Sequence, residues 1–157
     1  MLEQIIKTWQ THNKMNLLLL HAIDDEGLKA RPIAKREGMN VAHQFAHMQN
    51  VRYWGIEAHC KEYLDGVEKI ERERAENRKL LVKSLRDSAV TVENMIKDVT
   101  EGKAKFRSFK QGVIVYMGYL ISHESHHRGL IMISLKQSGI KLTDKLKWGI
   151  WEWGKES

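Results

Sequence analysis

The sequence predicts an all-α protein, a four-helix bundle with a short extra C-terminal helix. Apolar residues recur at the three- to four-residue spacing of helices over four long stretches of the chain. Pro32 is the only proline, and segments that are rich in turn residues or alternate in polarity are scarce. The length of 157 residues, with 42% hydrophobic and 29% charged residues, fits a single domain. We place this domain at residues 1–157, with a C-terminal extension from about residue 141.

The first half of the chain predicts two helices. Residues 2–22 form the first, because their apolar and amide side chains share one helical stripe. The stripe comprises Leu2, Ile5, Ile6, Trp9, Asn13, Asn16, Leu17 and Leu20. Residues 24–39 contain two glycines and the proline, which indicates a long connection. Asn40 then provides an N-cap for a second helix, which we expect to end near residues 65–66.

The second half predicts two further long helices. A very polar run at residues 68–79 leads into the third, which ends at Glu101 and Gly102. Its apolar stripe comprises Leu81, Leu85, Ala89, Val92, Ile96 and Val99. The fourth helix, at residues 111–138, is apolar on most sides, as expected of a helix buried in a bundle. Gly139 follows as its C-terminal stop.

Two shorter segments flank the fourth helix. Residues 103–110 are basic, and we expect a solvated connection anchored by Phe106 and Phe109, with a mobile lid over the bundle mouth as the alternative. After the fourth helix, Thr143 can cap a short final helix. We expect this short helix to pack across the bundle or against a second subunit, and its segment carries three tryptophans: Trp148, Trp151 and Trp153.

The net charge of +6 raises the question of nucleic-acid binding. Basic and acidic residues are interleaved along most of the chain, as at residues 68–74, and such mixing is typical of a solvated helix face. No recognised nucleic-acid-binding motif accompanies the charge. We therefore do not expect a nucleic-acid partner.

The single cysteine and the apolar runs indicate the cellular compartment of the protein. Cys60 has no partner for an intramolecular disulfide, and we expect it to be buried and unreactive in a reducing cytoplasm. The N-terminus does not have the pattern of a signal peptide. The longest apolar run, residues 113–121, is too short to span a bilayer. A cytoplasmic protein without membrane contact is the expectation.

Two histidine pairs provide the main functional signal. His43 and His47 are four residues apart on the second helix, and His123 and His127 repeat this spacing on the fourth. Residues at this spacing lie on one helix face, so each pair can present two imidazoles to one point. Val51 and Trp54 share the stripe of His43 and His47, and we expect this side of the second helix to face the core.

A lone histidine is more often a core residue whose ring nitrogens are hydrogen-bonded. Four neighbouring buried imidazoles without a metal would each need a hydrogen-bond partner of their own. The pattern therefore predicts a transition-metal site between helices.

Spacing alone leaves the number of ligands open. Four histidines would close a tetrahedral shell and make the site structural, whereas three would leave room for water or substrate. The sequence from His123 to His127 also matches the His-Glu-x-x-His pattern of metalloproteases, with Glu124 as general base. We give this alternative little weight, because the all-helical context does not contain the sheet and the third-ligand signal of those enzymes.

Several short phrases resemble the DinB/YfiT-like family. They are residues 28–32 (Leu-Lys-Ala-Arg-Pro), residues 45–48 (Phe-Ala-His-Met) and the His-x-x-x-His-Arg-Gly pattern that ends at Gly129. The resemblance covers nearly the whole chain in helix order. It implies a four-helix bundle, often dimeric, in which three histidines hold a divalent metal such as zinc or nickel. Carried over to this chain, the ligands are His47, His123 and His127.

The resemblance also assigns roles to the neighbouring residues. His43 falls outside the triad and becomes a group beside the ligands or facing the substrate, while His126 is expected at the surface or at an interface. Where the family commonly has a glutamine after Arg-Gly, this chain has Leu130, which removes a polar group near the site.

Family members of assigned activity are mostly thiol-dependent transferases that use bacillithiol or mycothiol, together with a related isomerase. The resemblance thus implies transfer of a low-molecular-weight thiol to a small electrophile, with hydrolysis of a small substrate as the nearest variant. Candidates to assist are His43, Tyr116, Arg128 and Asn16, each of which could equally be a hydrogen-bonded structural residue. Arg128 could hold an anionic substrate or form an ion pair between helices. The competing interpretation is a non-enzymatic metal-binding stress-response module.

Overall fold

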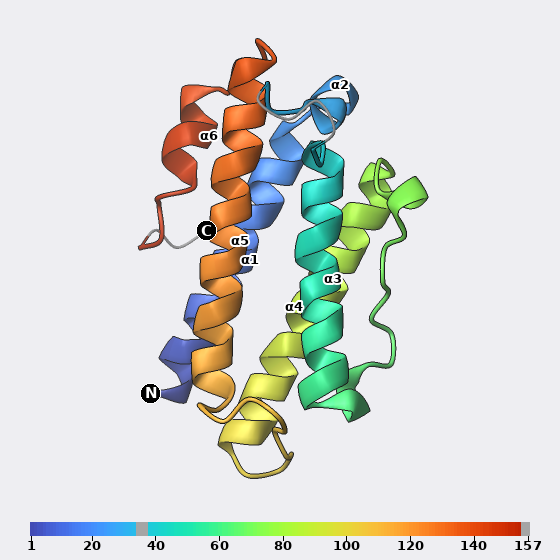
Figure 1. Ribbon diagram of the computed structural model, residues 1–157. Helices are drawn as coiled ribbons and strands as arrows, with labels where there is room; N and C mark the ends of the chain where they lie inside the picture. Colours follow the sequence, from blue (N-terminus) through green and yellow to red (C-terminus); the bar gives the residue numbers. More distant parts are fainter. Residues whose placement is uncertain (34–37, 155–157) are drawn as a thin grey trace.

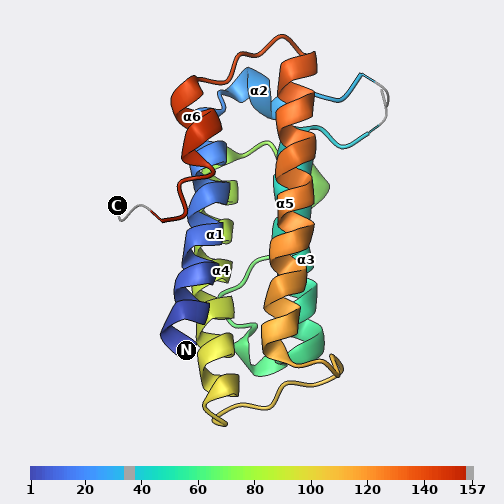
Figure 2. The same cartoon turned by 90° about the vertical axis from the view of Figure 1, so that its left-hand side faces the viewer.

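The computed structural model describes residues 1–33 and 38–154, and it confirms the all-α bundle (Figures 1 and 2). The four long helices are α1 (Leu2–Ala22), α3 (Val41–His59), α4 (Arg78–Thr100) and α5 (Val113–Gln137). Within the described ranges there is no strand, and no helix is both long and apolar enough to cross a membrane. The predicted bounds of the first and fourth helices agree with the structure to within two residues.

The long helices have an up-down-down-up order, with α1 and α5 antiparallel to α3 and α4 (Figure 1). Such an order needs a long connection between α3 and α4, and residues 60–77 provide it by running back along α3. This segment is held by the amides of Gln49 and Asn50, which donate to the carbonyl oxygens of Glu68 and Ile70 at 2.8 and 2.9 Å. It includes two single 3-10 turns, η1 (Lys61–Tyr63) and η2 (Arg72–Arg74).

The second helix ends at His59, so the prediction that it would extend to residues 65–66 is wrong. Cys60 leaves the helical conformation with φ −154° and ψ 58°, and its side chain is fully buried in the core beside Ile56. Burial of Cys60 therefore ends the helix before the Asp65–Gly66 signal is reached. The Asn40 cap is confirmed, because its side chain accepts a hydrogen bond from the backbone N–H of His43 at 2.8 Å.

Two short helices complete the fold. One of them, α2 (Asp25–Lys29), lies inside the predicted connection and is capped by Asp24. The other, α6 (Asp144–Gly149), begins at the predicted Thr143 cap and packs against α1. Leu146 of this helix and Ile150 directly after it are buried, whereas the three tryptophans are 41–75% exposed: Trp148, Trp151 and Trp153. The predicted packing of this short helix across the bundle is therefore confirmed, and it is made by Leu146 and not by the tryptophans.

A polar layer divides the core into two apolar halves. One half contains Phe45, Leu81 and Leu135, and the other contains Trp9 and Ile56. Between them, each long helix contributes buried polar side chains at about the same level: His12, Asn13, Asn16, Arg52, Ser88, Glu124 and His127. The candidate functional site lies at this level of the bundle.

Candidate metal centre

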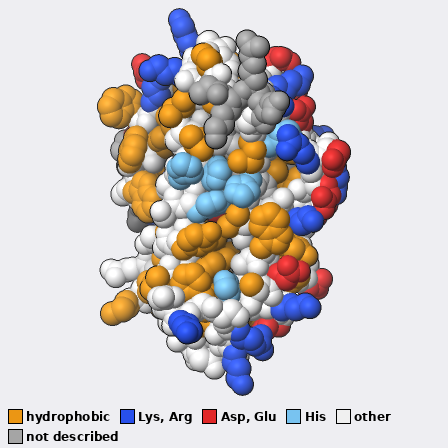
Figure 3. All heavy atoms as spheres, viewed as in Figure 1, with side chains coloured by type: hydrophobic (Ala, Val, Ile, Leu, Met, Phe, Trp, Pro, Cys, Tyr) orange, Lys and Arg blue, Asp and Glu red, His pale blue; other side chains and the backbone are white. Residues whose placement is uncertain are grey.

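The structure brings His47 of α3 together with His123 and His127 of α5. One ligand nitrogen from each histidine lies within 4.8 Å of the others, and the ring centroids are 4.6–5.1 Å apart. In the space-filling view, histidines gather in the middle of the face that α3 and α5 share (Figure 3). The single turn between His123 and His127 places both rings on the side of α5 that faces α3.

A neighbouring amide orients one of the three rings. The buried amide Oε1 of Gln44 accepts a hydrogen bond from Nδ1 of His127 at 3.2 Å, which leaves Nε2 of that ring for a ligand. Nδ1 of His123 is buried with no hydrogen-bond partner among the described residues, as expected of a nitrogen that meets a metal. Leu130, which stands where the resemblance implies a glutamine, is 37% exposed. The amide beside the cluster is that of Gln44 on α3 instead.

The three imidazoles are held in the neutral form that a metal requires. Burial lowers the pKa of His47 and of His123, with the charge of His47 adding to the effect at His123. Burial, together with the neighbouring His123 and His47, lowers the pKa of His127 to about 4. Neutral rings keep a free lone pair at physiological pH, so the donor set fits a zinc- or nickel-type ion.

Among the described residues, the cluster contains no fourth histidine, carboxylate or thiolate. Nε2 of His43 instead donates to the backbone carbonyl of Arg72 at 3.3 Å, which directs this ring to the returning connection. His126 is exposed on α5, as expected. The prediction that Trp54 faces the core is wrong, because its side chain is 46% exposed. A three-nitrogen donor set leaves coordination positions for water or substrate.

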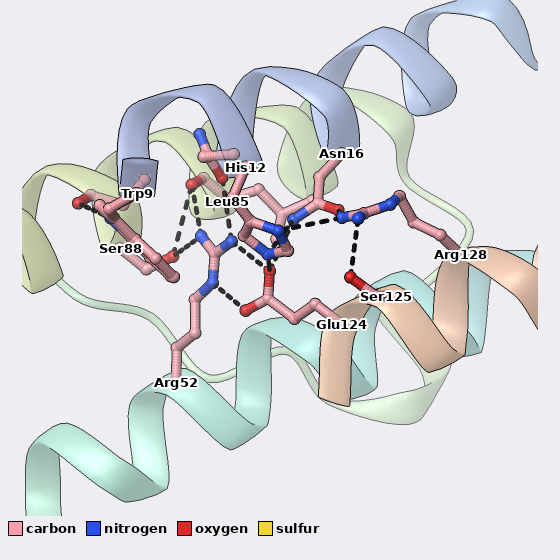
Figure 4. A network of polar contacts seen from close by, with 11 residues as sticks. Trp9, His12, Asn16, Arg52, Leu85, Ser88, Glu124, Ser125 and Arg128 are labelled. Carbon is pink, nitrogen blue, oxygen red and sulfur yellow. Dashed lines mark hydrogen bonds and ion pairs between the residues drawn. The ribbon is translucent and has the colours of Figure 1, made fainter. Parts of the chain in front are cut away.

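Glu124 does not belong to the cluster but to a buried ionic network on the side of α5 that faces α1 (Figure 4). Its side chain is fully buried and forms a bidentate pair with Arg52: Nε donates to Oε1 at 2.6 Å and Nη2 to Oε2 at 2.7 Å. Oε2 also accepts from His12 Nε2 at 2.8 Å and from Asn16 Nδ2 at 2.6 Å. Four donors therefore surround this carboxylate.

Arg52 is satisfied just as fully. Nη1 donates to the Leu85 carbonyl at 3.0 Å and to the Ser88 hydroxyl at 3.1 Å, and Nη2 donates to Asn13 Oδ1 at 2.9 Å. The guanidinium carbon lies 4.8 Å from the ring centroid of Trp9. The network thus joins all four long helices through one arginine.

Arg128 extends the network toward α1. Nη1 donates to Asn16 Oδ1 at 2.6 Å and to His12 Nδ1 at 3.2 Å, and Nη2 donates to Ser125 at 2.8 Å. Because Nδ1 of His12 accepts from Arg128 while Nε2 donates to Glu124, this ring is neutral, and burial lowers its pKa. The guanidinium of Arg128 therefore contacts α1.

The network excludes Glu124 as the general base of a metalloprotease. Burial alone would raise the pKa of this carboxyl, but the charge and hydrogen bonds of Arg52, and then those of His12, outweigh burial and hold the pKa well below its usual range. A carboxylate with four bound donors has no free position from which to activate water. The sequence pattern from His123 to His127 therefore combines two different surfaces of α5.

Sequence reasoning missed Arg52 and His12 altogether. One signal was present in the sequence. Glu124 and Arg128 are four residues apart and offset by one position from His123 and His127, so they lie on a different face of the helix and could have indicated a second polar site there. The amides of the first helix, which lie in its otherwise apolar stripe, could also have indicated buried polar partners.

Tyr116, a candidate to assist chemistry, is buried against α3. Its hydroxyl has no hydrogen-bond partner among the described residues, and burial raises its pKa. A Cβ built at Gly55 would lie 1.5 Å from this oxygen, so the absence of a side chain at Gly55 makes room for the hydroxyl.

Gly55→Ala should destabilise the protein by about 1–3 kcal/mol, because the new methyl group overlaps the Tyr116 hydroxyl and the bundle must shift to admit it. Urea denaturation measures the change. Gly118→Ala is the matched control, since nothing lies within 4 Å of the added Cβ, and it should stabilise α5 by up to about 1 kcal/mol. Equal effects of the two substitutions would contradict the assigned packing.

The basic segment at residues 103–110 is anchored as expected. The backbone N–H of Arg107 donates to the carbonyl of His59 at 2.9 Å, and His59 Nδ1 donates to the carbonyl of Arg107, also at 2.9 Å. The rings of Phe106 and Phe109 lie 5.6 and 5.5 Å from that of Tyr116. These contacts favour an anchored connection over a mobile lid.

Comparison with known proteins agrees with the fold and the cluster. The family model described as "DinB family" matches residues 1–144, and these include all three clustered histidines. Neither the curated proteins nor the solved structures gave a match. Because the family model matches more than half of the chain, the chain belongs to the DinB family.

Proposed function

We propose that this protein holds a divalent zinc- or nickel-type ion through His47, His123 and His127 and uses it to transfer a low-molecular-weight thiol to a small electrophile. The observation that carries the proposal is the convergence of three neutral imidazoles with no fourth protein ligand in the described ranges. Such a site can bind an ion and still admit a reactant.

The chemistry divides between the ion and the chain. When bound, the ion lowers the pKa of a thiol that reaches it. The thiol gives up its proton to water, its sulfur forms a bond to the electrophilic carbon, and the leaving group departs with the bonding electron pair. The three histidines keep the ion in place, and Gln44 fixes the ring of His127.

The thiol in this proposal comes from outside the chain. Cys60 is the only cysteine, and its side chain is fully buried. Burial raises the pKa of its thiol to about 11, so little thiolate forms near neutral pH.

Cys60 should therefore react with a thiol reagent such as dithionitrobenzoate far more slowly in the native protein than in urea. Its exclusion from solvent requires opening of the fold, so labelling should be slowed by several orders of magnitude at neutral pH. The absorbance of released thionitrobenzoate follows the reaction. Labelling at the same rate in both states would show that the cysteine is accessible and could supply the thiol itself.

Thiol transfer is tested with the protein loaded with zinc or with nickel. Bacillithiol, mycothiol and glutathione are each offered with a neutral alkyl or aryl halide, and halide release is measured. The metal-free protein and a His127→Ala variant serve as controls. Turnover that needs both metal and thiol supports the proposal. Metal binding without turnover for any thiol would favour the non-enzymatic metal-binding module, and halide release without thiol would favour hydrolysis.

We also propose that the protein forms a homodimer through the outer face of α5. Exposed Val115, Ser122, His126, Gly129 and Ile133 lie along this face, and the first exposed charged side chain of α5 is Lys136. A surface helix normally has charged residues on its solvent side. A nearly uncharged face of this length is suited to a two-fold contact between identical helices.

A charge placed on this face should shift the protein from dimer to monomer. Val115 and Val90 are 53% and 58% exposed, on α5 and α4 respectively, so Val115→Glu and Val90→Glu form a matched pair. Sedimentation equilibrium should show dissociation for Val115→Glu only. A monomeric wild-type protein, or two variants that behave alike, would remove the support for this interface.

A further inference from the structure

We propose that a second site, an apolar pocket between the end of α5 and α6, binds a fatty acid, that is, an aliphatic chain with a negatively charged carboxylate head. The pocket has a volume of about 810 Å³, which lies within the range of small-molecule sites. None of its lining residues belongs to the histidine cluster, so this site is independent of thiol transfer. The anchored walls of the pocket, its aliphatic lining and the cations at its rim support this ligand.

The chain reverses direction after α5, and this reversal forms one wall of the pocket (Figures 1 and 2). Gly139 has a φ of +75°, and its backbone N–H donates to the carbonyl of Lys136 at 3.1 Å. The backbone N–H of Ile140 donates to the carbonyl of Leu135 at 3.0 Å, which completes the Schellman motif and ends the helix in a defined geometry. The other wall is α6, which packs against α1 and buries Leu146. Because both walls are anchored, a ligand has little conformational entropy of the chain to remove.

The lining of the pocket is aliphatic. Its apolar side chains come from α5 and from the reversal that follows it: Met132, Ile133, Ile140 and Leu142. All of these except Ile133 pack against the core yet stay only partly buried, so their outer sides remain open to the pocket. Among the described residues, no aromatic side chain lines it. Since burial of apolar surface is favourable in proportion to its area, such a lining is suited to an alkyl chain.

The charges at the rim favour a ligand with an anionic head. Four charged side chains line the pocket: Lys136, Lys141, Asp144 and Lys147. The carboxylate of Asp144 is paired with the ammonium group of Lys147 at 3.0 Å. Lys136 and Lys141 are exposed and form no ion pair within residues 1–33 and 38–154. Two ammonium groups are therefore available to donate charge-assisted hydrogen bonds to a carboxylate.

Calorimetric titration of the zinc-loaded protein tests the chemical class of the ligand. Decanoate should bind more tightly than decan-1-ol, which has no charge. It should also bind at least about 10-fold more tightly than hexanoate, whose chain is shorter by four methylene groups. Lys136→Gln/Lys141→Gln should weaken decanoate binding by about 3- to 10-fold and leave the binding of decan-1-ol unchanged. Lys97→Gln is the matched control, because it removes an exposed lysine of α4 that does not line the pocket, and it should bind decanoate as the wild type does.

Two further titrations establish where decanoate binds. A carboxylate could also reach an ion held by the histidines, so the metal-free protein is titrated and should bind decanoate with the affinity of the zinc-loaded form. Ile133 lies on the face of α5 proposed for the dimer, so Val115→Glu is titrated as well. The substituted position is about 27 Å away along the helix, and the pocket is formed within one chain, so this variant should also bind decanoate normally.

The inference would be overturned by equal affinity for decanoate and decan-1-ol, by an unchanged affinity in the double lysine variant, or by binding that requires zinc or the dimer. A membrane surface is the other partner to test, because Trp148 is 70% exposed directly after Lys147. Attachment of the protein to phosphatidylglycerol vesicles, without binding of monomeric decanoate, would assign this region to a membrane surface and would also overturn the inference.

Discussion

His127→Ala protein, loaded with zinc and then dialysed, should contain only a small fraction of the metal that the wild type contains. His127 is buried at the centre of the cluster, and its removal leaves two nitrogens from two different helices. Changes to groups that merely contact a ligand already lower metal affinity by about 10- to 100-fold. Loss of a ligand should exceed that range.

Elemental analysis of the purified proteins measures this effect. His126→Ala is the matched control, because it removes the neighbouring imidazole, which is exposed and lies outside the cluster. Circular dichroism establishes that both variants are folded. If His127→Ala and His126→Ala retained the same amount of zinc as the wild type, the three histidines would not be the binding site.

Arg52→Met should destabilise the protein by about 3–5 kcal/mol, the range for breaking a buried ion pair by removing one partner. Glu124 would remain fully buried, with its charge balanced only by hydrogen bonds from His12 and Asn16. Urea denaturation followed by circular dichroism gives the free energy of unfolding.

The double variant Arg52→Met/Glu124→Leu should recover part of that loss, because it leaves no unpaired charge in the core. A double-mutant cycle with Glu124→Leu isolates the interaction between the two side chains. Lys83→Met provides a surface comparison, since it breaks an exposed pair with Asp87 and should lower the free energy of unfolding far less than Arg52→Met does. A similar cost for Lys83→Met and Arg52→Met would contradict the role of the buried network.

The helices and their caps could be predicted because they depend on neighbouring residues. Asn40 and Thr143 each accept a hydrogen bond from the backbone N–H three residues later, so the signal is local. The end of α3 could not be predicted in this way. It depends on burial of Cys60 against residues distant in sequence, and no local pattern reports such packing.

The residues of the candidate site likewise divide into those that a sequence pattern identifies and those that depend on contacts distant in sequence. His47, His123 and His127 could be selected because their spacing and context repeat a known pattern. The partner of Glu124 could not be selected, because Arg52 lies 72 residues away and buried pairs have no fixed spacing in sequence. Trp54 was misplaced for a related reason. Helical periodicity assigns it to the side of His47, but that side faces the surface once α5 packs beside α3.

The polar layer across the bundle determines how a metal ion would be gained and lost. The layer fixes α3 and α5 against each other at the level of the three histidines, through contacts that involve no metal. In small zinc domains, by contrast, the ion itself supplies the free energy of folding. Here the apo protein should already have its final shape. A chelator would then remove the ion without unfolding the chain, and a different divalent ion could take its place.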